Sequence, residues 1–532
     1  MRKRPRRAVR YAIAGLAAAV MGLSACSAGA GSIGGASASA GTGTGGTLIV
    51  GITASDNPTM DVVPSQGLEA DRFMAFQIYD GLVAFDPNNF DAIVPDLAAS
   101  YSVSGSTWTF HLRQGVKFSD GTPFNADAVI FNLDRILNKN FKYYSATMSA
   151  QTAVRTSLIA SYKKIDENTV TITTKGVDDL LKYELPYILF ASPTAVKKWG
   201  NTNYAMHPVG TGPFMFSSEV PRQSLTMVRN PDYWGTPAKL DKLVLRPMPD
   251  PAARYAALQS GEINWAEVPP PDAIPQMKEA GFQVLTGPYA HDWYYQVNMS
   301  IPPFNDVRVR EAFMYAIDKV GLCTDLLHGA CQPADGPLTK QQTNWYNPTA
   351  TTYAYNPTKA KQLLAAAGYK NGVTITVKMP SAGSGNMWPL EMAPYIQQDE
   401  QAVGINIKFQ VVDWATLDSN DPFPKGVNLI ETSKGIRVPS DIERNFLDPP
   451  PGGQNTMGYT SPQLTQIADE LRKTPTDAGQ NALMKQASKI LQDDLPWLVI
   501  VHDLNLRALA PDVHGFTEPS SWFANLKTVW VS

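Results

Sequence analysis

Apolar and polar side chains alternate in several short stretches of the chain, which is the pattern of half-buried strands. The clearest stretch is 107–112, where Trp108, Phe110 and Leu112 alternate with more polar residues. On this pattern, and on enrichment in aromatic and β-branched residues, strands are predicted at 47–52, 107–112, 373–378, 405–412 and 497–501.

Other segments repeat their apolar residues every three or four positions, as helices do. In 126–138 this spacing places Val129, Leu133 and Ile136 on one face, and Asn125 is suited to cap the helix start. Further helices are predicted at 309–327, 357–367, 387–403, 463–472 and 480–492. Because strands and helices alternate without a clear internal repeat, the predicted fold class is layered α/β.

The N-terminus has the pattern of an export signal. Six cations lie within the first ten residues, and an apolar run follows at 11–23. At about 1.5 Å per residue this run reaches only about 20 Å, too short for the roughly 30 Å hydrocarbon core of a bilayer. Residues 26–46 are mainly Gly, Ala, Ser and Thr, which predicts a flexible tether. We expect a signal peptide at 1–25; Arg6-Arg7 leaves the choice between general and twin-arginine export open.

Length and charge narrow the function classes. The chain has 532 residues, which suggests roughly three structural units at about 150 residues each. Its formal charge is −3, and beyond residue 10 it is −9, with 39 basic against 48 acidic residues. A chain this acidic has no general attraction to phosphate backbones, so we expect no nucleic-acid partner.

Cysteine and histidine usage predicts a disulfide and no metal site. In an exported protein Cys323 and Cys331, eight positions apart, are expected to form a disulfide, and two buried free thiols are the alternative. The six histidines have no ligand-like spacing, and neither a phosphate-binding P-loop nor a nucleophile elbow is present. We therefore expect no metal and no cofactor. The missing motifs do not exclude an enzyme, and the expectation of a non-enzymatic protein comes instead from a resemblance to a known family.

Several phrases along the chain together resemble a known family. They include Ile78-Tyr79-Asp80-Gly81-Leu82, Pro95-Asp96-Leu97-Ala98, Phe118-Ser119-Asp120-Gly121-Thr122-Pro123-Phe124, Arg229-Asn230-Pro231-Asp232-Tyr233-Trp234 and Pro303-Phe304-Asn305-Asp306-Val307-Arg308. Their number and order are similar to those of the cluster 5 extracellular solute-binding proteins of ABC importers, which include peptide- and nickel-binding proteins. Leu23-Ser24-Ala25-Cys26 likewise resembles a bacterial lipobox, in which Cys26 becomes the lipid-modified first residue.

The resemblance implies a two-lobed periplasmic-binding-protein-like clamshell (type II) with an additional subdomain in lobe one. Lobe one is expected at 47–289 plus 505–532, with the inserted subdomain at about 82–190, and lobe two at 290–504. The implied partners are a small solute or short peptide, the transmembrane subunits of an ABC permease with their ATPase, and the membrane through the lipid on Cys26. We expect an extracytoplasmic monomer.

Ligand contacts are expected at the crossing strand and at two loops of lobe two. Trp293 and Tyr294 offer aromatic surface, with hinge packing as the equal alternative. Trp388 follows the Gly- and Ser-rich loop 381–386, which approaches the ligand in relatives, but a core position is equally open.

Peptide-binding relatives carry a Trp and then an Asp that pairs with the peptide ammonium, and this pattern is missing from 431–441. The family's Asp position falls on Gly435, between Lys434 and Arg437. Either Asp441 or Asp292 replaces the lost carboxylate, or the ligand is not an ordinary peptide, since a buried unpaired ammonium is costly. We expect an anionic or neutral polar ligand group near Lys434 and Arg437, with solvated surface cations as the alternative.

Three functions are compatible with the sequence. The leading one is capture of a solute outside the cell for an ABC importer. The others are an extracellular peptide or glycan hydrolase and a ligand sensor with the same fold.

Overall fold

The structure, a computed structural model, describes residues 43–54, 61, 69–86, 92–382, 388–417, 423–448, 453–519 and 524–532. The predicted signal peptide, the lipid site Cys26 and the tether up to residue 42 lie outside these residues. No helix among the described residues is long and apolar enough to cross a membrane.

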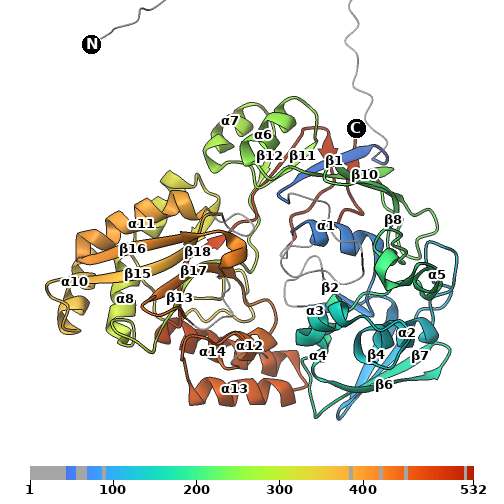
Figure 1. Ribbon diagram of the computed structural model, residues 1–532, viewed down its shortest axis with the longest axis horizontal. Helices are drawn as coiled ribbons and strands as arrows, with labels where there is room; N and C mark the ends of the chain where they lie inside the picture. The colour runs from blue at the N-terminus through green and yellow to red at the C-terminus, as the bar shows by residue number, and fades with distance from the viewer. Residues whose placement is uncertain are drawn as a thin grey trace, which may run out of the picture. The chain divides into compact units, whose positions relative to one another are not determined.

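A seven-stranded sheet organises the first half of the fold (Figure 1). Its central strand β1 pairs in parallel with β10 on one side and with β11 on the other. The strand order is β12 (Gln283–Leu285), β19 (Arg507–Leu509), β11 (Trp265–Glu267), β1 (Thr47–Ile52), β10 (Lys242–Pro247), β9 (Ser224–Arg229) and β8 (Phe214–Val220). Because β19 comes from the end of the chain, the C-terminal segment returns to the first half.

A four-stranded antiparallel sheet is inserted between β1 and β8. Its order is β4 (Ala98–Ser104), β5 (Thr107–Leu112), β7 (Thr169–Thr174) and β6 (Ile159–Asp166). The helices of the first half are α1 (Glu69–Ile78), α2 (Ala126–Leu137), α3 (Ala146–Thr156), α4 (Leu181–Glu184), α5 (Pro193–Tyr204), α6 (Pro251–Gln259) and α7 (Ile274–Glu279). Two small antiparallel pairs complete it, β2 (Val83–Phe85) with β3 (Ile93–Pro95) and β20 (Val513–His514) with β21 (Trp530–Val531).

A six-stranded mixed sheet organises the second half (Figure 1). Its order is β14 (Cys331–Pro333), β18 (Trp497–Asp503), β13 (Asp292–Val297), β17 (Leu429–Lys434), β15 (Val373–Pro380) and β16 (Ile405–Val412). The helices of this half are α8 (Val307–Ala316), α9 (Lys319–Gly321), α10 (Pro357–Ala366), α11 (Pro389–Val403), α12 (Ser440–Phe446), α13 (Pro462–Lys473) and α14 (Asp477–Asp494).

Local sequence signals located most of the predicted elements. The strands expected at 47–52, 107–112 and 405–412 coincide with β1, β5 and β16. The Asn125 side chain accepts a hydrogen bond from the Ala128 amide at the start of α2, and Val129, Leu133 and Ile136 are buried. Gly368, at φ +93°, follows α10 in the left-handed conformation that glycine tolerates.

The single helix predicted at 309–327 is wrong. The structure has α8, then α9, then a π-helical segment at Leu322–Leu326. Ile317 is extended, and the Asp318 carboxylate accepts a hydrogen bond from the Gly321 amide at 3.0 Å. Asp318 therefore caps a new helix where apolar spacing alone predicted continuity.

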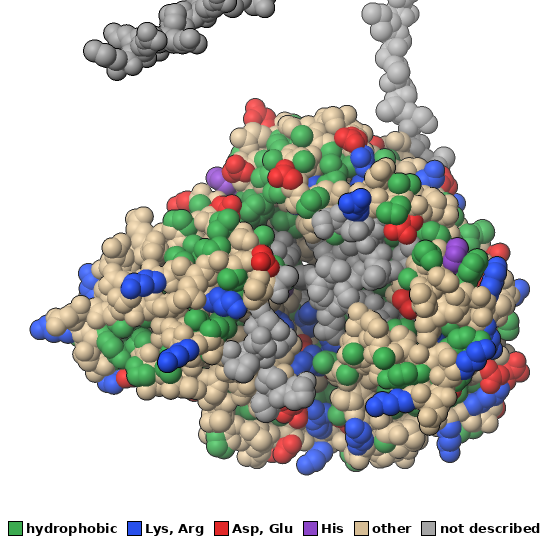
Figure 2. Space-filling view, viewed as in Figure 1, with side chains coloured by type: hydrophobic (Ala, Val, Ile, Leu, Met, Phe, Trp, Pro, Cys, Tyr) green, Lys and Arg blue, Asp and Glu red, His purple; other side chains and the backbone are tan. Residues whose placement is uncertain are grey.

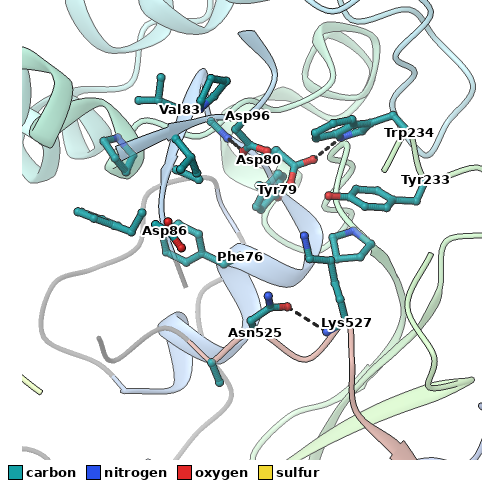
Figure 3. A pocket seen from close by; sticks show the side chains of 18 residues that line it. Phe76, Tyr79, Asp80, Val83, Asp86, Asp96, Tyr233, Trp234, Asn525 and Lys527 are labelled. Carbon is teal, nitrogen blue, oxygen red and sulfur yellow. Dashed lines mark hydrogen bonds between the residues drawn. The ribbon is translucent and has the colours of Figure 1, made fainter. Parts of the chain in front are cut away.

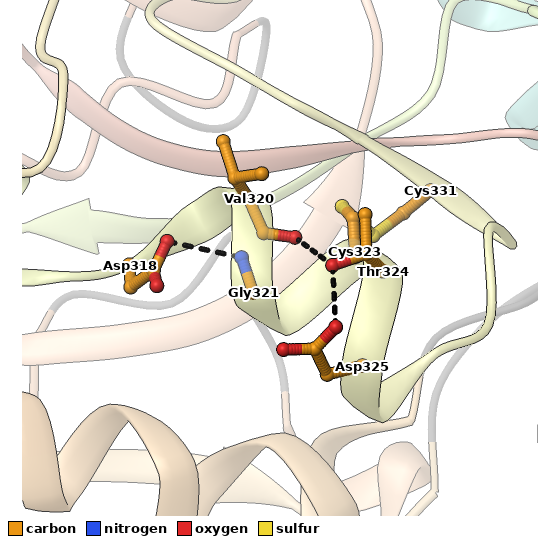
Figure 4. The surroundings of a disulfide bond; sticks show 7 residues. All are labelled: Asp318, Val320, Gly321, Cys323, Thr324, Asp325 and Cys331. Carbon is orange, nitrogen blue, oxygen red and sulfur yellow. Dashed lines mark hydrogen bonds between the residues drawn. A yellow bond between two sulfur atoms is a disulfide. The ribbon is translucent and has the colours of Figure 1, made fainter.

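A disulfide closes the turn after this segment (Figure 4). Cys323 and Cys331 are bonded, with their Cα atoms 5.2 Å apart. It joins the π-helical segment to β14, and both cysteines are buried.

The disulfide should contribute modestly to stability, because it closes a short loop. A Cys323→Ala/Cys331→Ala variant should lose about 2 kcal/mol of unfolding free energy, measured by urea denaturation. Adding a reductant provides the matched control. It should lower the unfolding free energy of the wild type and leave that of the variant unchanged. A variant as stable as the oxidised wild type would contradict this expectation.

Candidate functional site

The chain passes between the two halves twice, at a place we call the strand crossing. Residues 286–291 lead from β12 into β13, and residues 504–506 lead from β18 into β19. β13 lies between β17 and β18 in the second sheet, so the crossing is continuous with its centre (Figure 1). Contacts between side chains at the crossing therefore depend on the relative position of the halves.

Two buried His–Asp pairs link the crossing segments to each other. Nδ1 of His291 lies 3.0 Å from Oδ2 of Asp503, and Nδ1 of His502 lies 2.7 Å from Oδ1 of Asp292. The Tyr289 hydroxyl also donates to Asp503 at 2.7 Å. Burial raises the pKa of Asp292 to about 6, although its hydrogen bond with His502 acts in the opposite direction. Asp292, one of the two proposed substitutes for the missing carboxylate, thus pairs through Oδ1, whereas its buried Oδ2 has no hydrogen-bond partner among the described residues.

The two aromatic residues expected to face a ligand are buried in different apolar clusters. Trp293 is 1% exposed and packs on the α8 side of the second sheet. Tyr294 is 3% exposed and stacks on Trp497, with ring centroids 4.0 Å apart. Adjacent residues of a strand point to opposite faces of the sheet. Trp293 and Tyr294 therefore pack against the apolar clusters on its two faces.

Gly435 has no room for a side chain. A Cβ built on it would overlap the backbone carbonyl oxygen of Ala290 in the crossing segment. A side chain of any kind, an aspartate included, therefore does not fit at this position in this backbone.

The neighbouring cations lie at the end of β17. Lys434 is the cross-strand partner of Asp292, and its ammonium donates to the side-chain oxygen of Gln454. Arg437 follows two residues after Gly435, and both cations are partly buried. The structure thus brings Lys434 and Arg437 to the second-half side of the strand crossing.

Asp441 is fully engaged within its own turn. Its Oδ2 accepts from the amides of Arg437 and Val438 at 2.8 and 3.1 Å, and its Oδ1 accepts from Arg444 at 2.5 Å. Burial alone would raise its pKa, but the charges of Arg444, Arg155 and Arg437 lower it. Asp441 shapes the start of α12 and would have to lose these bonds to neutralise a ligand.

Trp388 immediately precedes α11, where its indole is partly buried and packs against the apolar cluster of the second half. Its Nε1 is buried and has no hydrogen-bond partner among the described residues. Of the predicted loop 381–386, residues 383–386 lie outside the described residues.

Two buried glutamates on the second sheet and α11 were not singled out from the sequence. Glu431 of β17 faces Tyr295 across the strand pair, and burial raises its pKa to about 8. Glu400 of α11 is fully buried, and burial raises its pKa well above the usual value. Neither Glu400 carboxyl oxygen, nor Oε2 of Glu431, has a hydrogen-bond partner among the described residues. Local sequence carried no signal for this, because the first four residues of β17 are all buried and do not alternate.

Three phrases of the family resemblance meet at one cavity of about 280 Å³ in the first half (Figure 3). Asp80, from the first phrase, accepts hydrogen bonds from Trp234 at 3.0 Å and from Thr211 at 2.8 Å. Burial raises the pKa of Asp80, and burial together with the charge of Asp80 raises the pKa of Asp96. Lys527, from the C-terminal segment, also lines this cavity. The cavity therefore brings together residues from near the start, the middle and the end of the chain.

Among the described residues no group of three or more His, Cys, Asp or Glu side chains is placed to hold a metal ion. On the face in Figure 2, the acidic and basic side chains of the described residues are interspersed.

Comparison with known proteins identifies the family. The model of bacterial extracellular solute-binding proteins, family 5 (middle), matches residues 92–434. The chain belongs to this family. Heme-binding protein A of Haemophilus influenzae is 30% identical over 83% of this chain and 84% of that protein. Glutathione-binding protein GsiB of Shigella flexneri is also 30% identical, over 83% of this chain and 87% of that protein.

Two solved structures share the fold. The periplasmic binding protein DppA from Helicobacter pylori, in complex with the peptide STSA, has a TM-score of 0.75 at 26% identity, covering 92% of this chain and 98% of that one. HbpA2 from Haemophilus parasuis has a TM-score of 0.77 at 25% identity, covering 92% of this chain and all of that one. This confirms the predicted α/β periplasmic-binding-protein fold with two lobes.

Family membership also decides the function class. This family 5 protein is the extracytoplasmic solute-binding component of an ABC transporter, and its family is one of non-enzymatic binding proteins. The hydrolase alternative has no support from the comparisons.

Proposed function

We propose that this protein captures a short peptide or peptide-like solute between its lobes and delivers it to an ABC permease. The observation that carries the proposal is that two separate sheets are joined at one strand crossing. A protein built in this way can enclose a ligand by hinge motion. Lobe one would comprise 47–289 and 505–532, with the subdomain 82–190, and lobe two 290–504.

The ligand is proposed to be acidic or neutral where an ordinary peptide presents its ammonium group. Gly435 excludes a carboxylate, Asp441 is engaged by two amides and Arg444, and Asp292 already pairs with His502 through one of its two carboxylate oxygens. Lys434 and Arg437 lie beside this position and favour an anionic group. Glutathione, the ligand in the name of two relatives, is a peptide-like solute with two carboxylates and is therefore the first probe.

The identity of the solute is tested by native mass spectrometry of the protein purified from a rich lysate, followed by denaturation. Release of peptides or of glutathione supports the proposal. A bound series of ordinary peptides would show that another carboxylate serves the ammonium. A single compound unrelated to peptides would refute the proposed ligand class.

Removing the two cations should weaken binding of glutathione. A Lys434→Ala/Arg437→Ala variant should lose at least about tenfold in affinity by calorimetry, which corresponds to about 1.4 kcal/mol. Lys408→Ala, on an exposed position of β16, is the matched control and should change little. Trialanine lacks the additional carboxylate, so its affinity should differ less between the variant and the wild type. Unchanged affinity for glutathione would contradict the role of the cations.

We further propose that Cys26 carries a lipid that anchors the protein to the membrane beside its permease. The lipobox-like phrase and the Gly-rich tether support this proposal. A Cys26→Ser change should release the protein into the medium or block its maturation, as measured by fractionation and intact mass. Unaltered membrane retention would refute the anchor without affecting solute binding.

A further inference from the structure

The two halves also meet at a second place, away from the strand crossing. Residues 178–180 and α4 of the inserted unit lie against α12, α13 and α14 of the second half (Figure 1). The Asp179 amide donates to the backbone carbonyl of Arg472 at 2.9 Å, so the contact includes a main-chain hydrogen bond between the halves.

Apolar side chains form the centre of this contact. Leu180 and Tyr183 are 2% and 4% exposed and belong to the same apolar cluster as the helices of the second half. The Tyr183 ring packs edge-on against Trp345 with centroids 6.4 Å apart, and its hydroxyl donates to Gln480 at 3.4 Å. If the halves separated, both side chains would become exposed to water, which is unfavourable.

Ion pairs surround these apolar anchors. Arg444 lies 3.2 Å from Glu184, Arg472 lies 2.6 Å from Asp178, and Lys182 lies 2.5 Å from Asp477. The Ser440 hydroxyl also donates to Glu184. An apolar centre with a polar rim is the usual composition of a specific protein interface.

Each half keeps partners for its own principal charges. Glu184 pairs with Arg155 at 2.5 Å inside the inserted unit. In the second half Arg444 pairs with Asp441, and Arg472 pairs with Glu443. Separation would therefore leave Glu184, Arg444 and Arg472 paired, and it would avoid the large penalty of an isolated buried charge. The ion pairs between the halves can therefore break without leaving these three charges unpaired.

We propose that this contact is a reversible latch that holds the two lobes closed over the ligand. Contacts that exist only in the closed state shift the equilibrium toward it, and slow the release of an enclosed solute. The inserted unit thereby acquires a role in the timing of release. This inference rests on the proposed capture of a solute between the lobes.

The latch is tested by hydrogen exchange of the full-length protein without ligand. The Asp179 amide is a direct reporter, since its acceptor is the Arg472 carbonyl. Arg472→Met removes the guanidinium and keeps this acceptor, and Leu180→Ala removes an apolar anchor. In both variants exchange at 178–184 should rise about tenfold or more, while exchange in α2 stays unchanged. Exchange at 440–447 should rise as well in Leu180→Ala, which keeps the Arg472–Glu443 pair inside the second half. Lys489→Met, which removes an ion pair within α14, is the matched control and should leave both segments unchanged.

A second measurement separates the latch from the proposed function. With glutathione as the probe, its dissociation rate should rise about tenfold in Arg472→Met and Leu180→Ala. Unchanged exchange in both variants would overturn the latch, even if glutathione binds. Increased exchange in the two variants, together with a wild type that binds neither glutathione nor peptides, would support the latch and refute the proposed solute class.

Discussion

A Gly435→Asp variant should lose about 4 kcal/mol or more of unfolding free energy, although it would place a carboxylate where we propose that peptide-binding relatives carry theirs. The new Cβ would overlap the carbonyl oxygen of Ala290. That carbonyl cannot move away easily, because the adjoining crossing segment is held by a hydrogen bond from the Asp503 amide to the His291 carbonyl at 2.9 Å. The clash therefore lies between two backbones and has no flexible side chain to absorb it.

Urea denaturation of the wild type and two variants measures this effect. Gly176→Asp is the matched control, since Gly176 is exposed and a Cβ there meets no atom within 4 Å. It should cost less than about 1 kcal/mol. A Gly435→Asp protein as stable as the wild type would show that the crossing segment can move, and it would reopen this position as a peptide-ammonium site.

The second large effect is a loss of unfolding free energy, caused by Glu431, as the pH rises from about 5 to about 8. Burial raises its pKa from 4.5 to about 8 in the folded protein, so folding favours the neutral acid. For such a group the stabilisation is complete below the unfolded pKa and is lost as pH rises through the folded pKa. Relative to a Glu431→Gln variant, the wild type should therefore lose on the order of 4 kcal/mol between about pH 5 and pH 8.

The measurement is the difference in unfolding free energy between wild type and Glu431→Gln across this pH range. Glu391→Gln, on the exposed face of α11, is the control and should show no comparable change with pH. Glu400 has a raised pKa for the same reason. Its titration adds a pH dependence of the same sign to the unfolding free energy of both proteins. A difference that does not vary with pH would show that Glu431 titrates normally or is hydrated in the folded state.

The sequence predicted elements whose signals are local. Asn125 caps α2 because its side chain reaches an amide three residues away, and alternation located β5 because a strand is buried on one face. The break at Asp318 was missed, because an aspartate inside an apolar helical pattern does not indicate whether it caps a new turn or faces solvent.

The candidate site stays a prediction, because its properties depend on residues far apart in the chain. The chemistry of Asp441 suggested a ligand partner, yet its carboxylate is taken up by two amides and Arg444. Trp293 and Tyr294 have the composition of a binding surface, but packing by separate clusters buries both. Burial of a given side chain is set by its neighbours in space, and no local pattern encodes those neighbours.

By itself, the sequence determined the layered α/β class, most strand and helix positions, and the resemblance that family comparison confirmed. These follow from periodicity, capping and short phrases, which act over a few residues. Only the tertiary structure decided that Gly435 meets Ala290, that Glu431 is buried with a raised pKa, and that Leu180 and Tyr183 pack into the opposite half. Each of these depends on contacts between segments more than a hundred residues apart, whose energies arise from packing and desolvation when the chain folds.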